Sequence, residues 1–198
     1  AGNDSGYGLL YGNVHQLYDL PIYKILEYAR IHVYCKSSVY ARICIVVASI
    51  HNTVFEYDGC YQKLETARKI AISEGISDTE VEVDLGTADM LFNQGLFGES
   101  LANLKLAWDT NVLLHGDGCV ENIEVALRIS KICLILHDKK TCQQWLGRIT
   151  HNLPKYSELN IFKLLIEAEL QEEVVLAEQV FDEAEIISWR LYGYIKPE

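Results

Sequence analysis

The stretch LGTADMLFNQGLFGESLANLKLAW, from Leu85 to Trp108, decides the fold. Apolar and small residues recur in it at steps of three and four on both sides of Gly95, which is typical of two amphipathic helices joined by a tight turn. Glycine favours such a turn because it adopts a left-handed backbone at no steric cost. The stretch therefore predicts a helical hairpin.

The same alternation of helical pattern and turn extends along the chain in both directions. The three prolines of the sequence are Pro21, Pro154 and Pro197, so residues 22–153 contain none, which suits long helices. Residues 1–19 are rich in glycine and short polar side chains, which predicts a flexible N-terminal tail. No strand is expected, and the fold class is all-α. The predicted helices are 20–34, 38–57, 61–74, 78–94, 97–114, 120–136, 141–150, 157–172 and 174–194.

An imperfect repeat runs through the middle of the chain. Gly59-Cys60-Tyr61 and Gly95-Leu96-Phe97 are interpreted as equivalent turns, because an aromatic residue follows each glycine by two positions and an alanine follows it by twelve. A third, looser unit begins at His137-Asp138. The period of about 36 to 43 residues is that of helical-hairpin solenoids.

In the stretch from Leu85 to Trp108, the sequence resembles the tetratricopeptide repeat (TPR) family. The stretch 109–136 is similar to the longer linkers of variants whose repeats are about 42 residues apart. The resemblance implies a right-handed superhelical array of antiparallel helix hairpins, a TPR-like α-solenoid. It implies one helical domain, 20–198, with its best repeats at 38–154 and a C-terminal helix pair at 157–194. The residues on the family's small, turn, aromatic, bulky and small positions are Ala88, Gly95, Phe97, Leu104 and Ala107, with Ser100 where the family has alanine.

The net charge and the length of the apolar runs disfavour several classes of protein. With 28 acidic and 17 basic side chains the formal net charge is −11, which disfavours a nucleic-acid partner. The longest apolar run, 43–50, is far shorter than the roughly 20 residues that span a bilayer. No signal peptide is visible in the first twenty residues. Six cysteines lie mostly within apolar helical patterns, so we expect reduced thiols and a cytoplasmic or nuclear location.

One string of residues has the composition of a metal site. Cys133, His137 and Cys142 include residues four apart, which share a helix face and present ligands that zinc prefers. No fourth ligand accompanies them, and Cys133 stands where the helix requires a small apolar residue. We interpret the two cysteines as buried neutral thiols. No metal and no cofactor is predicted.

Other arrangements also lack what their chemistry requires. The histidines and cysteines show no surrounding nucleophile motif. The glycines Gly2, Gly6 and Gly8 are followed by no lysine, which a phosphate-binding loop needs. The carboxylates between Glu167 and Glu185 lack Glu-x-x-His spacing, and they indicate a solvated acidic face, with a docking surface as the alternative. The protein is therefore not expected to be an enzyme.

In a stack of helical hairpins, the first helices line a concave groove that can hold a peptide or helix. Family members that bind acidic C-termini use a clamp of lysine, asparagine and arginine, whereas Thr53, Glu56, Glu82 and Asp89 stand at those positions here. A neutral, apolar or basic protein segment is the expected partner. The predicted groove residues are Ser49, Thr53, Glu56, Glu82, Leu85, Asp89, Phe92, Asn93, Glu124, Leu127, Arg128 and Lys131.

The leading hypothesis is a non-enzymatic protein–protein interaction module that serves as a scaffold or adaptor in a multiprotein complex. The alternative is a helical subunit that associates through its terminal helices, with a homodimer as one form of it. A helical ligand-binding or enzyme domain is a third class, for which the sequence shows no pocket of perturbed titratable groups. The aromatic residues that carry the alternative are Tyr7, Tyr11, Tyr18, Trp189, Tyr192 and Tyr194.

Overall fold

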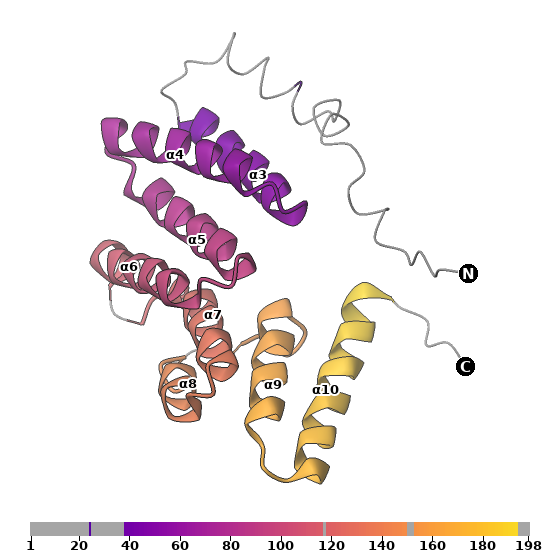
Figure 1. Ribbon diagram of the computed structural model, residues 1–198. Helices are drawn as coiled ribbons and strands as arrows, with labels where there is room; N and C mark the ends of the chain where they lie inside the picture. Colours follow the sequence, from indigo (N-terminus) through magenta and orange to yellow (C-terminus); the bar gives the residue numbers. More distant parts are fainter. Residues whose placement is uncertain (1–23, 25–37, 117, 150–152, 194–198) are drawn as a thin grey trace, which may run out of the picture. The chain divides into compact units, whose positions relative to one another are not determined.

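The protein is described here by a computed structural model, which covers residues 24, 38–116, 118–149 and 153–193. The predicted tail, 1–19, lies outside the described residues, and so does the predicted helix 20–34 apart from Lys24. Within these residues every regular element is an α-helix and none is a strand, which confirms the all-α fold class (Figure 1). The helices are α3 (Ser38–Thr53), α4 (Tyr57–Glu74), α5 (Ser77–Asn93), α6 (Phe97–His115), α7 (Asn122–Ile135), α8 (Lys139–Leu146), α9 (Glu158–Leu170) and α10 (Val174–Tyr192).

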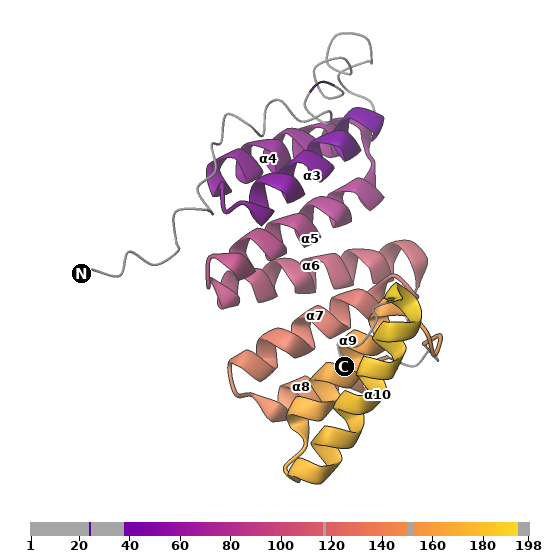
Figure 2. The same ribbon diagram turned by 90° about the vertical axis from the view of Figure 1, so that its right-hand side faces the viewer.

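The described helices form two compact units, which divide between Asn103 and Leu104, inside α6. In the first unit, α3 and α4 form an antiparallel hairpin, and α5 packs against both of them (Figures 1 and 2). Burial of the apolar faces of these three helices holds the unit together. Its core residues include Ala41, Cys44, Val47, Cys60, Leu64, Ala67 and Val83.

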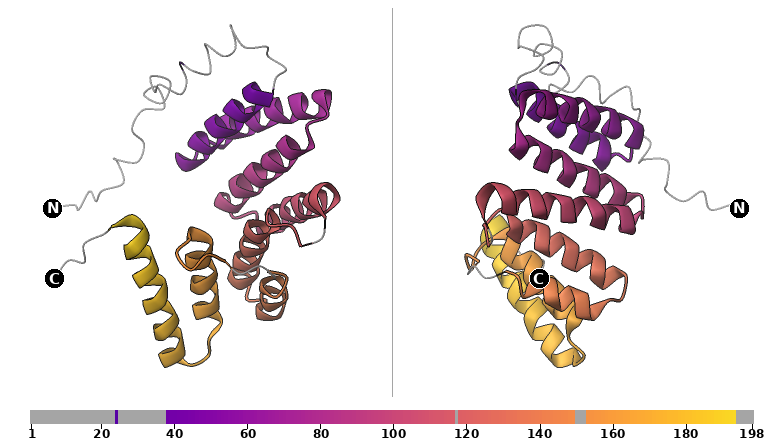
Figure 3. Two further views of the ribbon diagram at one scale, coloured as in Figure 1. Left: turned by 180° about the vertical axis from the view of Figure 1, so that it is seen from behind. Right: turned by 90° about the vertical axis from the view of Figure 1, so that its left-hand side faces the viewer.

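In the second unit, α7 packs against both α8 and α9. The last two helices, α9 and α10, run antiparallel as a hairpin of their own (Figure 3). The indole rings of Trp108 and Trp145 meet edge to face at 5.0 Å between centroids, and the guanidinium of Arg148 lies 4.1 Å from the centroid of Trp145. This aromatic contact ties α6 to α8 within the unit.

Three of the helix-to-helix turns, those at residues 55, 95 and 137, have the same backbone geometry, which the turn between α4 and α5 at Gly75 shares. In each, one residue adopts a left-handed conformation, and the amide of the next residue donates to a carbonyl five positions earlier, as in a Schellman motif. The left-handed residues are Phe55, Gly95 and His137, with φ of 61°, 76° and 59°. The hydrogen bonds are Glu56 N to His51 O at 2.9 Å, Leu96 N to Leu91 O at 2.9 Å, and Asp138 N to Cys133 O at 2.8 Å.

The position of the first turn corrects the predicted repeat. Gly59 lies inside α4 and not in the turn, so its predicted equivalence to Gly95 is wrong. The equivalent of Gly95 is Phe55, 40 residues earlier, and His137 follows 42 residues later. Gly59 serves another purpose, because a Cβ atom built on it would lie 2.6 Å from Nδ1 of the buried His51. The absence of a side chain at Gly59 allows α3 and α4 to approach each other closely.

With the register corrected, small buried residues recur at matching places in the three hairpins. In each hairpin a small residue of the first helix precedes one of the second helix by twelve positions. Ser100 Oγ donates to Ala88 O at 2.7 Å, so the two helices approach closely enough for a direct contact. A larger side chain would separate the helices. The pairs are Ala48 and Cys60, Ala88 and Ser100, and Ser130 and Cys142, all at most 1% exposed.

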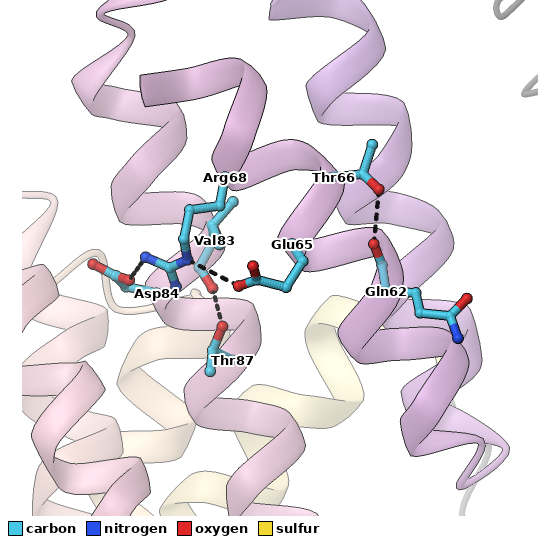
Figure 4. A network of polar contacts seen from close by, with 7 residues as sticks. All are labelled: Gln62, Glu65, Thr66, Arg68, Val83, Asp84 and Thr87. Atoms are coloured by element: carbon cyan, nitrogen blue, oxygen red, sulfur yellow. Dashed lines mark hydrogen bonds and ion pairs between the residues drawn. The ribbon is translucent and has the colours of Figure 1, made fainter. Parts of the chain in front are cut away.

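A charged pair links α4 to α5. The guanidinium of Arg68 extends from α4, and its Nη1 atom lies 2.8 Å from Oδ1 of Asp84, whose side chain is only 5% exposed (Figure 4). Arg68 Nε is also 3.6 Å from Oε1 of Glu65, one turn earlier on α4. Burial raises the pKa of Asp84, and the hydrogen bonding and charge of Arg68 oppose that rise. The arginine is therefore the partner that keeps this carboxylate acceptable in the interior.

Several boundaries also differ from those predicted. α8 begins two residues early, at Lys139, because the carboxylate of Asp138 accepts the amide of Thr141 at 3.0 Å and caps the helix. This hydrogen bonding lowers the pKa of Asp138. α9 begins after Ser157, whose Oγ accepts the amide of Asn160. Along the described residues, no helix is long and apolar enough to cross a membrane.

Candidate functional site

The helices α3 and α5 of the first unit, each the first helix of a hairpin, lie side by side (Figure 2). At their N-terminal ends, Arg42 Nη2 lies 3.5 Å from Oε1 of Glu82. At their C-terminal ends, Nδ2 of Asn93 donates to Oδ1 of Asn52 at 3.2 Å. Because both ends of the two helices are linked, their outer stripes form one continuous surface.

We call this surface the α3–α5 face. It carries two polar stripes, one on each helix, whose members are spaced by seven and four residues and so share a side. Beside the polar stripe of α5, three residues after Glu82 and Asp89, Leu85 and Phe92 add a half-buried apolar stripe. The residues of the face are Arg42, Ser49 and Thr53 of α3, and Glu82, Leu85, Asp89, Phe92 and Asn93 of α5.

The side chains of the face differ in how firmly they are held. Phe92 packs edge to face on Phe97 of α6, with the ring centroids 5.4 Å apart, which fixes its orientation. Ser49 and Thr53 are exposed, and their hydroxyls donate to carbonyls one turn earlier on α3, at 2.7 Å each. Tyr57 also donates its hydroxyl hydrogen to the carbonyl of Asn93, at 3.1 Å. The end of α5 is thus anchored to the first hairpin.

The electrostatics of the face are mainly acidic. The pair of Arg42 and Glu82 is exposed, so it contributes only about 0–1 kcal/mol to stability. Asp89 is half-buried and lies close enough to the buried thiol of Cys60 to influence the pKa of that thiol. Burial raises the pKa of Cys60 to about 11, and the charge of Asp89 adds to the rise. The negative charge at Asp89 therefore acts across a partly dehydrated region.

Two of the predicted groove residues take part in other contacts or are buried. Glu56 lies in the turn between α3 and α4, where its Oε2 atom is 2.5 Å from Nδ1 of the buried His51. Leu127 is fully buried in the second unit, so its prediction as a groove residue is wrong. In the corrected repeat register Asn52 is the equivalent of Phe92. Glu56 lies four residues beyond that position.

The remaining predicted residues lie on α7, in the second unit. Arg128 donates through Nε and Nη2 to Oε1 of Glu124, one turn earlier, at 3.1 and 2.5 Å. The ammonium of Lys131 lies 5.6 Å from the ring centroid of Phe162 on α9. These three side chains are close together on one helix, and they belong to a different unit from the α3–α5 face.

The predicted groove residues Ser49 and Thr53 share one side of α3 with Arg42, in spite of the wrong register. The error of four residues is close to one helical turn of 3.6 residues, which rotates a side chain by only about 40°. Reasoning from that register missed Arg42 and Asn52. The left-handed residue at 55 was the signal that could have found them, but the conformation of a phenylalanine is hard to anticipate.

The cysteine thiols are the other group of side chains whose reactivity and metal-binding arrangement bear on function. The five described cysteines are free, and burial is the main cause that raises the pKa of each thiol, to about 11 for Cys142. His137 is exposed in the turn between Cys133 and Cys142, which are both buried. Within the described ranges, no group of three or more His, Cys, Asp or Glu side chains is arranged to hold a metal ion.

We expect iodoacetamide to alkylate Cys119 faster than Cys60 or Cys142 in the native chain. Cys119 is half-buried, whereas the other two are at most 1% exposed, and the thiolate is the reactive form. Peptide mass spectrometry after timed quenching measures the three rates. Equal labelling of Cys60 and Cys119 would show that the first hairpin opens readily, contrary to the packing described above.

No protein-family model matches the chain, and no curated protein matches it significantly.

Proposed function

We propose that the protein is a non-enzymatic interaction module that holds a segment of a partner protein against the α3–α5 face. The single observation that carries this proposal is the alignment of α3 and α5, which joins two polar stripes and an apolar stripe into one surface. A peptide lying across such a surface meets apolar anchors and hydrogen-bonding groups together. Scaffolds and adaptors in multiprotein assemblies work in this way.

A TPR-like α-solenoid is the architecture that we propose for the chain. It is supported by the turns at Phe55, Gly95 and His137, which follow one another at 40 and 42 residues, and by the small residues that recur twelve positions apart in each hairpin. Hairpins that repeat in this way stack with a constant rotation, which generates a right-handed superhelix with a concave side. The first helices then line the concave side.

The chemistry of the face favours a neutral, apolar or basic segment. Glu82 and Asp89 are acidic, and the one cation of the face, Arg42, is already paired with Glu82. Leu85 and Phe92 offer apolar contact area, and Phe92 is held in place by Phe97. An acidic peptide would meet like charge here, which lowers both affinity and association rate.

The double variant Glu82→Lys/Asp89→Lys is expected to lose binding to basic peptides that the unaltered chain selects. Selection from a phage-displayed random peptide library identifies such peptides, and fluorescence anisotropy then measures their affinities. Reversing two charges in contact with a basic ligand weakens binding by about tenfold or more.

The matched control is Glu74→Lys/Asp109→Lys, which changes the net charge equally at two exposed positions outside the face. Circular dichroism verifies that both variants remain helical. Selected peptides that are acidic, or that bind the two variants equally well, would contradict the assignment of the α3–α5 face.

A further inference from the structure

The last hairpin carries a groove that belongs to neither stripe of the α3–α5 face. It lies between α9 and α10 and has a volume of about 460 Å³, within the range of protein binding pockets. Both helices contribute to its walls, and all of its lining residues lie in the second unit. They are Ile161 and Leu165 of α9, and Phe181, Asp182, Ala184, Glu185, Ser188 and Trp189 of α10.

The apolar walls of this α9–α10 groove reach the surface. Phe181 is 42% exposed and Leu165 is 37% exposed, so both leave apolar area in contact with water. Ala184 is buried between the helices, and its small side chain leaves space at the floor of the groove. Along α10 the lining residues extend from 181 to 189, which corresponds to about 12 Å of helix. That length matches two turns of a helix laid in the groove.

The rim of the groove is negatively charged. Asp182 and Glu185 lie in its wall, and α9 and α10 together carry seven acidic and two basic side chains. Both basic side chains have partners: Lys163 Nζ lies 3.1 Å from Oε1 of Glu167, and Arg190 donates to the hydroxyl of Tyr156. Among the described residues, Asp182 and Glu185 form no ion pair. These two carboxylates are therefore available to a ligand.

We propose that the α9–α10 groove is a docking site for a basic amphipathic helix of a partner protein. Leucine-like side chains on one face of that helix fill the space between Leu165 and Phe181. Its lysine or arginine side chains pair with Asp182 and Glu185 at the rim. The apolar walls supply the binding energy, and the carboxylates set the orientation and the association rate.

The charge of the groove argues against the other occupants. A second copy of this chain would place one acidic hairpin against another, and like charges across an interface are unfavourable. A membrane surface rich in anionic lipids is repelled for the same reason. A basic helix is the occupant whose charge complements the rim and whose shape fits an apolar groove of this length.

Fluorescence anisotropy with a labelled probe peptide tests this proposal on the full chain. The probe is a helix of leucine and lysine, about 14 residues long so that it is helical when bound, and its counterpart replaces lysine by glutamate. We expect the lysine peptide to bind and the glutamate peptide not to bind. Added salt should weaken the binding, because rim charges are screened.

Two pairs of variants locate the binding. Asp182→Lys/Glu185→Lys should weaken binding of the lysine peptide by about tenfold. The control Glu178→Lys/Glu183→Lys has the same net charge, and its positions on α10 lie outside the groove lining. It should change the affinity by less than about threefold. Phe181→Ala should weaken the peptide as well. Ile186→Ala, which removes a residue that is 52% exposed and lines no part of the groove, should not.

Three results would overturn the proposal. One is the absence of binding by the lysine peptide, and another is equal weakening in the two charge-reversal variants, which reflects net charge and not the groove. The third is a dimer of the unaltered chain, seen by light scattering, that Phe181→Ala dissociates, because a second copy would then be the occupant. The charge variants and the alanine variants all lie outside the α3–α5 face, so their results do not depend on the function proposed for that face.

Discussion

Replacing Arg68 by methionine is expected to lower the free energy of unfolding by about 3 kcal/mol at neutral pH, because it leaves a buried carboxylate without its partner. Nη1 of Arg68 lies 2.8 Å from Oδ1 of Asp84, and among the described residues no hydrogen bond other than this contact satisfies that oxygen. Methionine retains much of the apolar length of the arginine stem, so the loss reports mainly the charge. Urea denaturation followed by far-ultraviolet circular dichroism measures it.

The loss in Arg68→Met should become smaller in acid. Burial raises the pKa of Asp84 and Arg68 opposes the rise, so removing Arg68 raises this pKa further. A carboxyl group with a raised pKa favours the folded state fully below its unfolded pKa of about 3.9, and this contribution is lost as the pH rises through the folded pKa. The difference between variant and unaltered chain is therefore largest at neutral pH and decreases toward about pH 4. The other carboxylates contribute equally to the pH dependence of both chains, so their contribution cancels in that difference.

The double variant Arg68→Met/Asp84→Ala is the control for this prediction. The equivalent positions in the neighbouring hairpins are Cys44 and Ala126, both fully buried, so a small apolar side chain suits the site. We expect the double variant to regain most of the lost stability. A double variant as unstable as Arg68→Met, or a loss that is independent of pH, would contradict the charge explanation.

The variant Gly59→Ala is expected to lower the free energy of unfolding by about 2 kcal/mol, although alanine is the better helix former. A Cβ atom at this position would lie 2.6 Å from Nδ1 and 2.8 Å from Cε1 of His51. The ring of His51 is buried and bonded to Glu56, so it has little room to move. The new methyl group must separate α3 from α4 or displace the ring, and thermal and urea denaturation measure the cost.

The matched control is Gly98→Ala, in the first turn of α6. A Cβ atom there meets nothing within 4 Å, so only the helix preference changes. We expect Gly98→Ala to leave stability unchanged or to raise it by up to about 1 kcal/mol. The interpretation of Gly59 as a contact glycine fails if both alanine variants change stability in the same direction.

The helices themselves were largely predictable from the sequence. Leu104 and Ala107, which the resemblance places at a bulky and a small position of the predicted helix 97–114, are 1% and 0% exposed. An apolar stripe at helical spacing is a local pattern, and burial of that stripe is its direct consequence. The predicted repeat register is displaced by four residues at the first hairpin, because Gly59 lies inside α4 and Phe55 forms the turn.

The α9–α10 groove shows a second limit. The sequence indicated a solvated acidic face after Glu167, with a docking surface as the alternative, but Phe181 and Leu165 gave no sign that they line one groove. They are 16 residues apart and on different helices. Contacts between helices depend on how the helices pack, and this has no local signature in the sequence.

The amino-acid sequence by itself determined the all-α class, the approximate helices and the acidic charge, because each follows from composition or from a period of 3.6 residues within one element. Tertiary structure alone decided that Phe55 forms the first turn, that Arg68 pairs with Asp84, and that α3 and α5 align into one face. Each of these depends on packing between helices. A phenylalanine adopts a left-handed backbone, and a carboxylate becomes buried, only where contacts from neighbouring helices offset the cost.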